Sequence, residues 1–200
     1  MKTHNIFADT IFETNVPLID SEYNFIKETK YIPYLSKGGN ESDDKQILNN
    51  IELKSLKIKI INQLTIYVYN ILKVDPKIKF YMTGSWVNKY TLNDGAGVHC
   101  HPYSYISGVY YIDVPENSGD IHFYKRSSYL AGGSPLMYSE ANSFNSNKYH
   151  IKPKKGDLLF FSSDMLHSVN SNLSDKERYS IAFNFFVKGN LGKEPYGVSI

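Results

Sequence analysis

The feature that most constrains the fold is a change of pattern at Asp75-Pro76. Before it, from Gln46 to Val74, apolar residues recur at steps of about three and four, which predicts an amphipathic helix that ends at the proline. After it, short runs rich in Val, Ile, Tyr and Phe alternate with Gly, Asn, Asp and Pro, which is typical of strands and turns. We expect strands at residues 78–90, 97–102, 105–113, 119–124, 149–152, 157–162, 167–171 and 178–188.

A succession of short strands without intervening helices indicates a sandwich or barrel. We therefore predict a mainly β fold of the jelly-roll type, with the long N-terminal helix packed on one sheet. The 200 residues fit a single domain. Within it, we expect residues 1–75 to form an extended and helical support layer and residues 76–190 to form the β core.

Composition narrows the classes of partner. The formal net charge is only +2, so no overall field would attract nucleic acid or an anionic membrane surface. No apolar run is long enough to span a membrane as a helix. The single cysteine, Cys100, excludes an internal disulfide and favours a reducing compartment. We expect a cytoplasmic protein that acts on a small-molecule or peptide substrate, without nucleic acid or a membrane as partner.

Two histidines lie close together in the stretch DGAGVHCHPYSYISGVYY, residues 94–111. On a strand, residues i and i+2 point to the same face. His99 and His101 would therefore present two imidazoles to one side and Cys100 to the other, an arrangement suited to gripping a metal ion. Taken alone, the same pattern also fits two polar residues on an exposed strand edge.

The last predicted strand has one polar and one apolar face. The polar face carries Arg178, Ser180, Ala182 and Asn184, and the apolar face carries Tyr179, Ile181, Phe183 and Phe185. An apolar face of this kind is expected to pack on the helix, which turns the arginine inward. Arg178 is one of only two arginines. A buried guanidinium requires an anion, either a structural carboxylate or a small anionic ligand.

These motifs together resemble a known family. His-x-His is followed about sixty residues later by GDLLFFSSDMLHSV, with His167, and then by RYSIAFNF. This order resembles the 2-oxoglutarate- and Fe(II)-dependent oxygenases. It is most similar to bacterial and phage members that read H-x-H-P-x-S, S-G-V-Y-Y, F-x-S-x-x-x-H and R-x-S-I-x-F-N. The resemblance covers residues 85–186, roughly half of the chain.

The resemblance implies a double-stranded β-helix, with Fe(II) held by His99, His101 and His167. It further implies that 2-oxoglutarate chelates the iron and extends its distal carboxylate to Arg178 and Ser180, which suits a charge-assisted bidentate pair. Further candidates to line the co-substrate pocket are Tyr111, Asn88 and Tyr90, for each of which ordinary core packing is an equally good interpretation. The implied reaction uses O₂ to hydroxylate a C–H bond and releases succinate and CO₂.

One residue departs from the common pattern of the superfamily. Many members have His-x-Asp, and His101 stands where the aspartate would be. Asp94 or Asp164 could supply a carboxylate instead, or His99 could be the lone ligand of its pair. Three histidines also occur in cupin-like dioxygenases that do not use 2-oxoglutarate, and the fold could serve as a non-catalytic metal-binding module. The carboxylate clamp Arg178-x-Ser180 favours the oxygenase.

Four further features carry expectations of their own. The long aperiodic segment 125–148 is expected to cover the active site, since loops of this length are commonly functional. Arg126 on that segment could meet an anionic substrate. His122 could line the mouth of the pocket, and Cys100 is expected to be a small packed residue.

Overall fold

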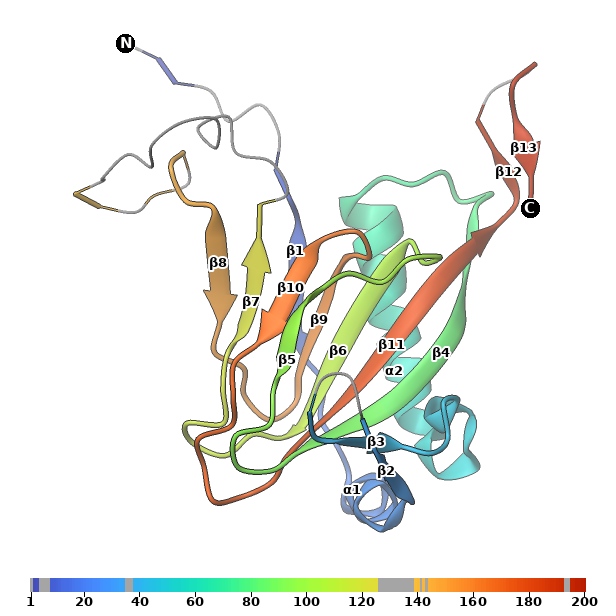
Figure 1. Ribbon diagram of the computed structural model, residues 1–200. Helices are drawn as coiled ribbons and strands as arrows, with labels where there is room; N and C mark the ends of the chain where they lie inside the picture. Colours follow the sequence, from blue (N-terminus) through green and yellow to red (C-terminus); the bar gives the residue numbers. More distant parts are fainter. Residues whose placement is uncertain are drawn as a thin grey trace.

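Two antiparallel sheets form the body of the molecule in the computed structural model, which describes residues 2–3, 8–34, 38–125, 139–140, 142, 144–192 and 195–200 (Figure 1). The larger sheet has the order β1-β9-β6-β11-β4-β3-β2 and the smaller sheet the order β5-β10-β7-β8. Side chains from both sheets meet between them, where Tyr111, Phe123 and Phe161 belong to one buried apolar cluster.

The strand bounds are as follows. The larger sheet contains β1 (Ile11–Asn15), β2 (Tyr31–Pro33), β3 (Asn40–Ser42), β4 (Lys79–Tyr90), β6 (Ile106–Asp113), β9 (Asp157–Ser162) and β11 (Arg178–Lys188). The smaller sheet contains β5 (Ala96–His99), β7 (Ile121–Tyr124), β8 (Lys148–Ile151) and β10 (Leu166–Val169). A separate hairpin of β12 (Asn190–Leu191) and β13 (Val198–Ser199) projects beyond the end of β11 (Figure 1).

The predicted jelly-roll fold is confirmed. Each of the expected strands has a counterpart, but β1, β2 and β3 of the larger sheet were not predicted as strands, and some strand ends differ. The strand expected at 97–102 ends at His99, and the strand expected at 167–171 ends at Val169. No helix in the described part of the chain is long and apolar enough to cross a membrane.

The prediction of one helix from Gln46 to Val74 is wrong in its first third. Two short 3₁₀ turns, Ile47–Asn49 (η1) and Ile51–Leu53 (η2), precede the α-helix α2 (Lys54–Thr65), which continues into a π-helical turn, Ile66–Ile71 (η3). Asn50 is extended between the 3₁₀ turns, and its side-chain amide donates to the Ile47 carbonyl at 2.8 Å. Such local bonds from asparagine compete with helix formation.

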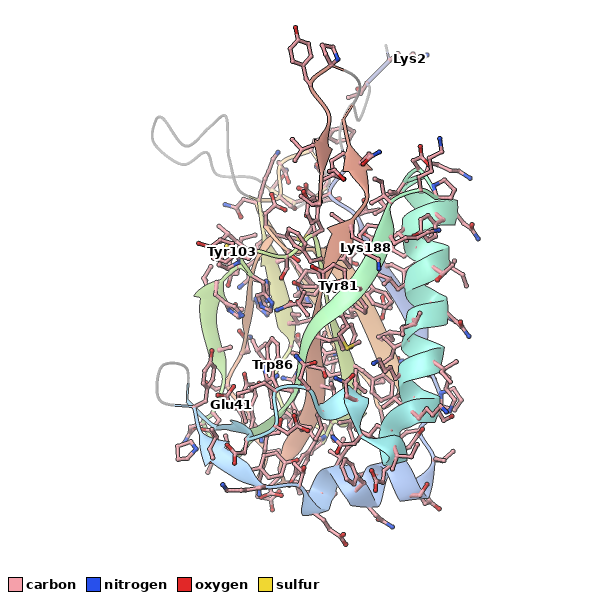
Figure 2. All side chains as sticks on the ribbon, turned by 90° about the vertical axis from the view of Figure 1, so that its right-hand side faces the viewer. Lys2, Glu41, Tyr81, Trp86, Tyr103 and Lys188 are labelled. Atoms are coloured by element: carbon pink, nitrogen blue, oxygen red, sulfur yellow. The ribbon has the colours of Figure 1, made fainter. Side chains whose placement is uncertain are left out.

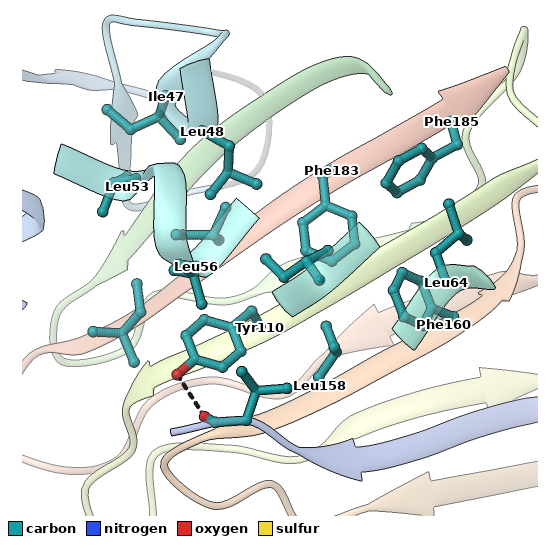
Figure 3. Packing of buried hydrophobic residues seen from close by; sticks show 14 of the residues in the cluster. Ile47, Leu48, Leu53, Leu56, Leu64, Tyr110, Leu158, Phe160, Phe183 and Phe185 are labelled. Carbon is teal, nitrogen blue, oxygen red and sulfur yellow. Dashed lines mark hydrogen bonds between the residues drawn. The ribbon is translucent and has the colours of Figure 1, made fainter. Parts of the chain in front are cut away.

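The helix covers the outer face of the larger sheet (Figure 3). Leu56, Ile60 and Leu64 of α2 are buried in one cluster with Phe183 and Phe185 of β11. The face of β11 that carries Tyr179, Ile181, Phe183 and Phe185 therefore packs against the helical layer, as its apolar character predicted. At the lower end of the sheet, a second helix, α1 (Asp20–Glu28), adds Ile26 to the same cluster.

The packing around β6 generates a prediction about stability. A Cβ at Gly108 would lie 2.2 Å from the Phe183 ring and 2.7 Å from the Leu159 carbonyl oxygen. Gly108→Ala should therefore lower the free energy of unfolding by about 1–3 kcal/mol through overpacking. Gly97→Ala is the matched control, because no atom lies within 4 Å of its added Cβ. Equal denaturant midpoints for the two variants would contradict the packing described.

Candidate metal and co-substrate site

Three histidines from two neighbouring strands and the turn that follows one of them converge between the sheets. His99 ends β5 and lies opposite His167 of β10 in the antiparallel ladder. His101 follows after the strand end, where its backbone N–H donates to the Ser163 carbonyl at 2.8 Å. The ring centroids of His99 and His167 are 4.2 Å apart, and that of His101 lies 5.2 Å and 5.0 Å from them. Their ligand nitrogens all lie within 4.8 Å of one another, as a shared metal ion requires.

Each imidazole is oriented by a hydrogen bond at Nδ1. The Nδ1 of His99 donates to the Gly97 carbonyl at 2.8 Å and that of His167 to the Met165 carbonyl at 2.9 Å. The Nδ1 of His101 bonds the Oδ1 of Asn184 at 2.7 Å. Since these oxygens only accept, each neutral ring carries its proton on Nδ1. Nε2 is then the nitrogen with the lone pair, which is the form that binds a metal.

Sequence reasoning did not assign a role to Asn184 or Ser107. The Ser107 hydroxyl donates to Asn184 Oδ1 at 2.8 Å, which fixes the amide that holds His101. The only sequence signal was that Asn184 lies in phase with Arg178 and Ser180 on the polar face of its strand. This position on the strand shows to which face the Asn184 amide points, but it does not show which residue the amide bonds.

The two aspartates considered as alternative ligands form other contacts. Asp94 Oδ2 accepts from the backbone N–H and the hydroxyl of Thr91, at 2.8 and 2.7 Å, and thereby closes the turn before β5. Asp164 is exposed, and its Oδ1 accepts from the Ser162 hydroxyl at 2.5 Å. Among the described residues, neither aspartate belongs to the group that could hold a metal ion, which consists of the three histidines.

Arg178 is buried without a carboxylate partner in the described part of the chain. Its side chain is 2% exposed, and its Nη1 donates to the backbone carbonyls of Ser118 and Gly119 at 3.2 and 3.1 Å. Among the described residues, its Nε has no hydrogen-bond partner, and the ring centre of the buried Tyr111 lies 5.2 Å from the guanidinium carbon. A buried cation is costly unless an anion offsets it. A guanidinium buried in this way is suited to binding an anionic group, and that role for Arg178 stays a prediction.

Two tyrosines beside this guanidinium remain protonated at neutral pH. Burial raises the pKa of Tyr111 and of Tyr90 to about 12, and the neighbouring Arg178 charge opposes the rise in both. Tyr90 is paired directly with Arg178 on β4, and Tyr111 is paired with Ser180 on β6. Their hydroxyls are thus available as hydrogen-bond donors to an anion.

One cavity joins the histidines to the arginine. Its volume is about 60 Å³. It is lined by all eight residues predicted to hold the metal or the co-substrate: Asn88, Tyr90, His99, His101, Tyr111, His167, Arg178 and Ser180. The structure brings them together, and their individual roles stay predictions.

The expectations for His122, Cys100 and the segment 125–148 had different outcomes. His122 does not line the cavity; its cross-strand neighbour on β8 is His150, with ring centroids 5.6 Å apart. Cys100 is half-buried, between the two histidines in sequence. Most of the segment 125–148 lies outside the described residues, and so does Arg126, so that its role as a cover stays a prediction.

The contacts of Asn184 generate a prediction about metal affinity. Asn184→Leu removes the oxygen that bonds His101 and Ser107, so Fe(II) or Ni(II) affinity should fall about 10- to 100-fold. Asn184→Asp keeps an acceptor in place and should bind the metal nearly as tightly as the unmodified protein. Anaerobic calorimetric titration measures both affinities. Unchanged affinity in Asn184→Leu would show that the amide does not position His101.

Comparison with protein families gives one match. A family model described as "Putative 2OG-Fe(II) oxygenase" matches residues 84–184, half of the chain, and this range includes all eight residues predicted to hold the metal or the co-substrate. Sequence comparison with curated proteins gave no match.

Several solved structures share the fold. A prolyl-4-hydroxylase from Pseudomonas putida has a TM-score of 0.60 at 14% identity, covering 88% of this chain and 92% of its own. HygX from Streptomyces hygroscopicus, with nickel and 2-oxoglutarate bound, has a TM-score of 0.61 at 8% identity, covering 88% and 82%. The epimerase SnoN from nogalamycin biosynthesis has a TM-score of 0.62 at 13% identity, covering 89% and 76%. At such low identities these structures show the shared fold alone.

Proposed function

The chain belongs to the 2-oxoglutarate- and Fe(II)-dependent oxygenase family, and we propose that His99, His101 and His167 hold its iron while Arg178 and Ser180 bind its co-substrate. The observation that carries this proposal is that three imidazoles and a buried, uncompensated guanidinium line one cavity. The protein is an enzyme that uses Fe(II), 2-oxoglutarate and O₂. Of the classes that the sequence left open, this is the oxygenase rather than the cupin-like dioxygenase or the non-catalytic metal-binding module.

The donor set fits Fe(II). Neutral imidazoles are suitable ligands for iron, and three on one side leave the remaining positions for a chelating co-substrate and O₂. Iron held by these three residues would supply the oxidation of a substrate C–H bond by O₂, coupled to the conversion of 2-oxoglutarate to succinate and CO₂. The protein contributes the orientation of the three rings through Gly97, Met165 and Asn184.

The co-substrate fits the other end of the cavity. Its distal carboxylate would accept hydrogen bonds from the Arg178 guanidinium, including the Nε that lacks a partner, and from the hydroxyls of Ser180 and Tyr111. The carbonyls of Ser118 and Gly119 hold the guanidinium in place. We assign Asn88 and Tyr90 to the wall of the same site.

The family acts on small-molecule or peptide substrates, and we propose hydroxylation of a C–H bond as the outcome for this enzyme. We place it in the cytoplasm, because a chain with a single cysteine suits a reducing compartment.

Removing the carboxylate clamp should weaken co-substrate binding selectively. Anaerobic addition of Fe(II) and 2-oxoglutarate should produce a weak visible charge-transfer band, because the chelating keto acid accepts charge from the metal. In Arg178→Ala this band should be lost or need at least about 30-fold more 2-oxoglutarate, as expected for the loss of a buried charge pair. Arg178→Lys keeps the charge without the bidentate geometry and should show an intermediate loss.

The controls separate the co-substrate from the metal. Both Arg178 variants should bind Fe(II) as the unmodified protein does, whereas His167→Ala should lose the metal and the band together. Iron binding without a band in the unmodified protein, and without succinate formation in air, would overturn the proposal. That result would support a cupin-like metal protein that does not use 2-oxoglutarate.

A further inference from the structure

A row of three aromatic side chains lies beyond the histidines, toward the outer end of β11. Phe186 of β11 contacts Tyr105 at a ring-centroid distance of 5.2 Å and Tyr81 of β4 at 6.3 Å, both edge-on. Tyr81 and Tyr105 are 45% and 46% exposed, and Phe186 is half-buried. We call Tyr81, Tyr105 and Phe186 the aromatic row. Large aromatic surface left half-exposed in this way is typical of a binding surface.

A bulge in β4 places Tyr81 on the same face as the site. Asn184 is paired with Gly84, but the next residue, Phe185, is paired with Met82, so Thr83 is an extra residue. Without the bulge, Tyr81 would lie on the opposite face of the sheet from Trp86. With it, Tyr81 is paired with Phe186 on the cavity side, and Met82 packs against the apolar core.

The aromatic row is the next cavity-facing layer after the metal ligands. Along β11 the residues on this face are Ser180, Ala182, Asn184 and Phe186, and Asn184 bonds His101. Phe186 follows Asn184 by two residues and therefore occupies the adjacent position on the same face. A group resting on the row would lie beside the proposed iron site and on the opposite side of it from Arg178.

Gly84 leaves room between the aromatic row and Trp86. The Trp86 ring lines the cavity with its centroid 6.1 Å from that of His101. A Cβ at Gly84 would make ordinary contacts, 3.7 Å from the Lys45 carbonyl oxygen and 3.9 Å from the Trp86 ring. Neither crowding nor a positive φ therefore requires glycine here. Gly84 is paired with Asn184 and so lies on the cavity-facing side of β4, and glycine in a strand interior commonly marks the close approach of a ligand.

The chemistry of this surface restricts its ligand. The three side chains of the row carry no charge, and the next pair outward on the same strands is Lys79 and Lys188. The uncharged surface of the row is thus followed outward by two charged side chains. Figure 2 shows Tyr81 and Tyr103 at similar heights with Trp86 below them. Tyr103 is 91% exposed and has φ 63, a rare conformation for a bulky residue that is commonly associated with functional turns.

We propose that the aromatic row, Gly84 and Trp86 form the substrate subsite of this oxygenase, and that the substrate presents an uncharged ring to it. This inference rests on the proposed function, because the subsite is defined by its position beside the proposed iron site. Aromatic side chains bind ring groups through stacking and edge contacts, and the half-exposed edge of the row allows the rest of the substrate to remain outside the cavity.

Trp86 provides a direct readout, because it is the only tryptophan in the chain. The protein is loaded with Zn(II) and 2-oxoglutarate, which prevents turnover, and is titrated with cyclohexanol while Trp86 fluorescence is recorded. Hexan-1-ol, with the same number of carbons and no ring, is the matched probe. We expect a saturable fluorescence change with cyclohexanol and about fivefold weaker binding of hexan-1-ol, whose chain must be ordered. Equal affinities would overturn the assignment of a ring.

Three variants test the location. Gly84→Val fills the space and Tyr105→Ala shortens the row, so each should weaken cyclohexanol binding by about fivefold. Tyr196→Ala, which removes an 88% exposed tyrosine before β13, should leave it unchanged. Cyclohexanol binding that is the same in all three variants would exclude the subsite.

The two proposals fail in different ways. If Fe(II) and 2-oxoglutarate give no charge-transfer band in the unmodified protein, the proposed function fails. If the band appears in the unmodified protein, Gly84→Val and Tyr105→Ala, but cyclohexanol does not change Trp86 fluorescence, the subsite alone is wrong.

Discussion

The pairing of β11 with β4 on one edge and β6 on the other fixes the geometry of the site. A strand that is hydrogen-bonded to a neighbour on both edges cannot rotate about its own axis. Its side chains therefore alternate strictly between the two faces of the sheet. Ile181 and Phe183 fill the core beneath α2, and Ser180 and Asn184 consequently face the cavity. A slip of one residue would exchange the two sets. Burial of the apolar face against the helix therefore also sets the position of Arg178.

Arg178 shows how the fold holds a group that is costly in isolation. The backbone carbonyls of Ser118 and Gly119 accept hydrogen bonds from Nη1 of the guanidinium. Among the described residues, Nε has no hydrogen-bond partner. Gly119 has φ +91, and a Cβ there would lie 2.2 Å from the Asn170 carbonyl oxygen. Only glycine fits this close approach. The turn that orients the arginine is thus fixed by packing, and the remaining donors are available to the co-substrate proposed above.

The parts of the structure that could be predicted from the sequence are those encoded by local periodicity. Alternation along residues 178–188 gave the two faces of β11 correctly, because the period of a strand depends only on the backbone. The parts that could not be predicted depend on distant partners. The helix begins late because Asn50 bonds its own turn and the Leu48 N–H donates to Ser85. The bond between His101 and Asn184 joins residues 83 positions apart, and no local pattern indicates it.

The charge of the proposed site links its three parts. Three neutral imidazoles leave a divalent metal with its full charge, and Arg178 adds another within the same cavity, whose walls include Phe161, Ile121 and Val169. In such apolar surroundings two like charges repel strongly, so the metal and the guanidinium together favour a dianion over a neutral ligand. 2-Oxoglutarate, as a dianion, would offset two of these three positive charges, so that little of the balance is left for the substrate to supply. A subsite built from uncharged aromatic rings is consistent with that balance, because it selects the substrate by shape while charge selects the co-substrate.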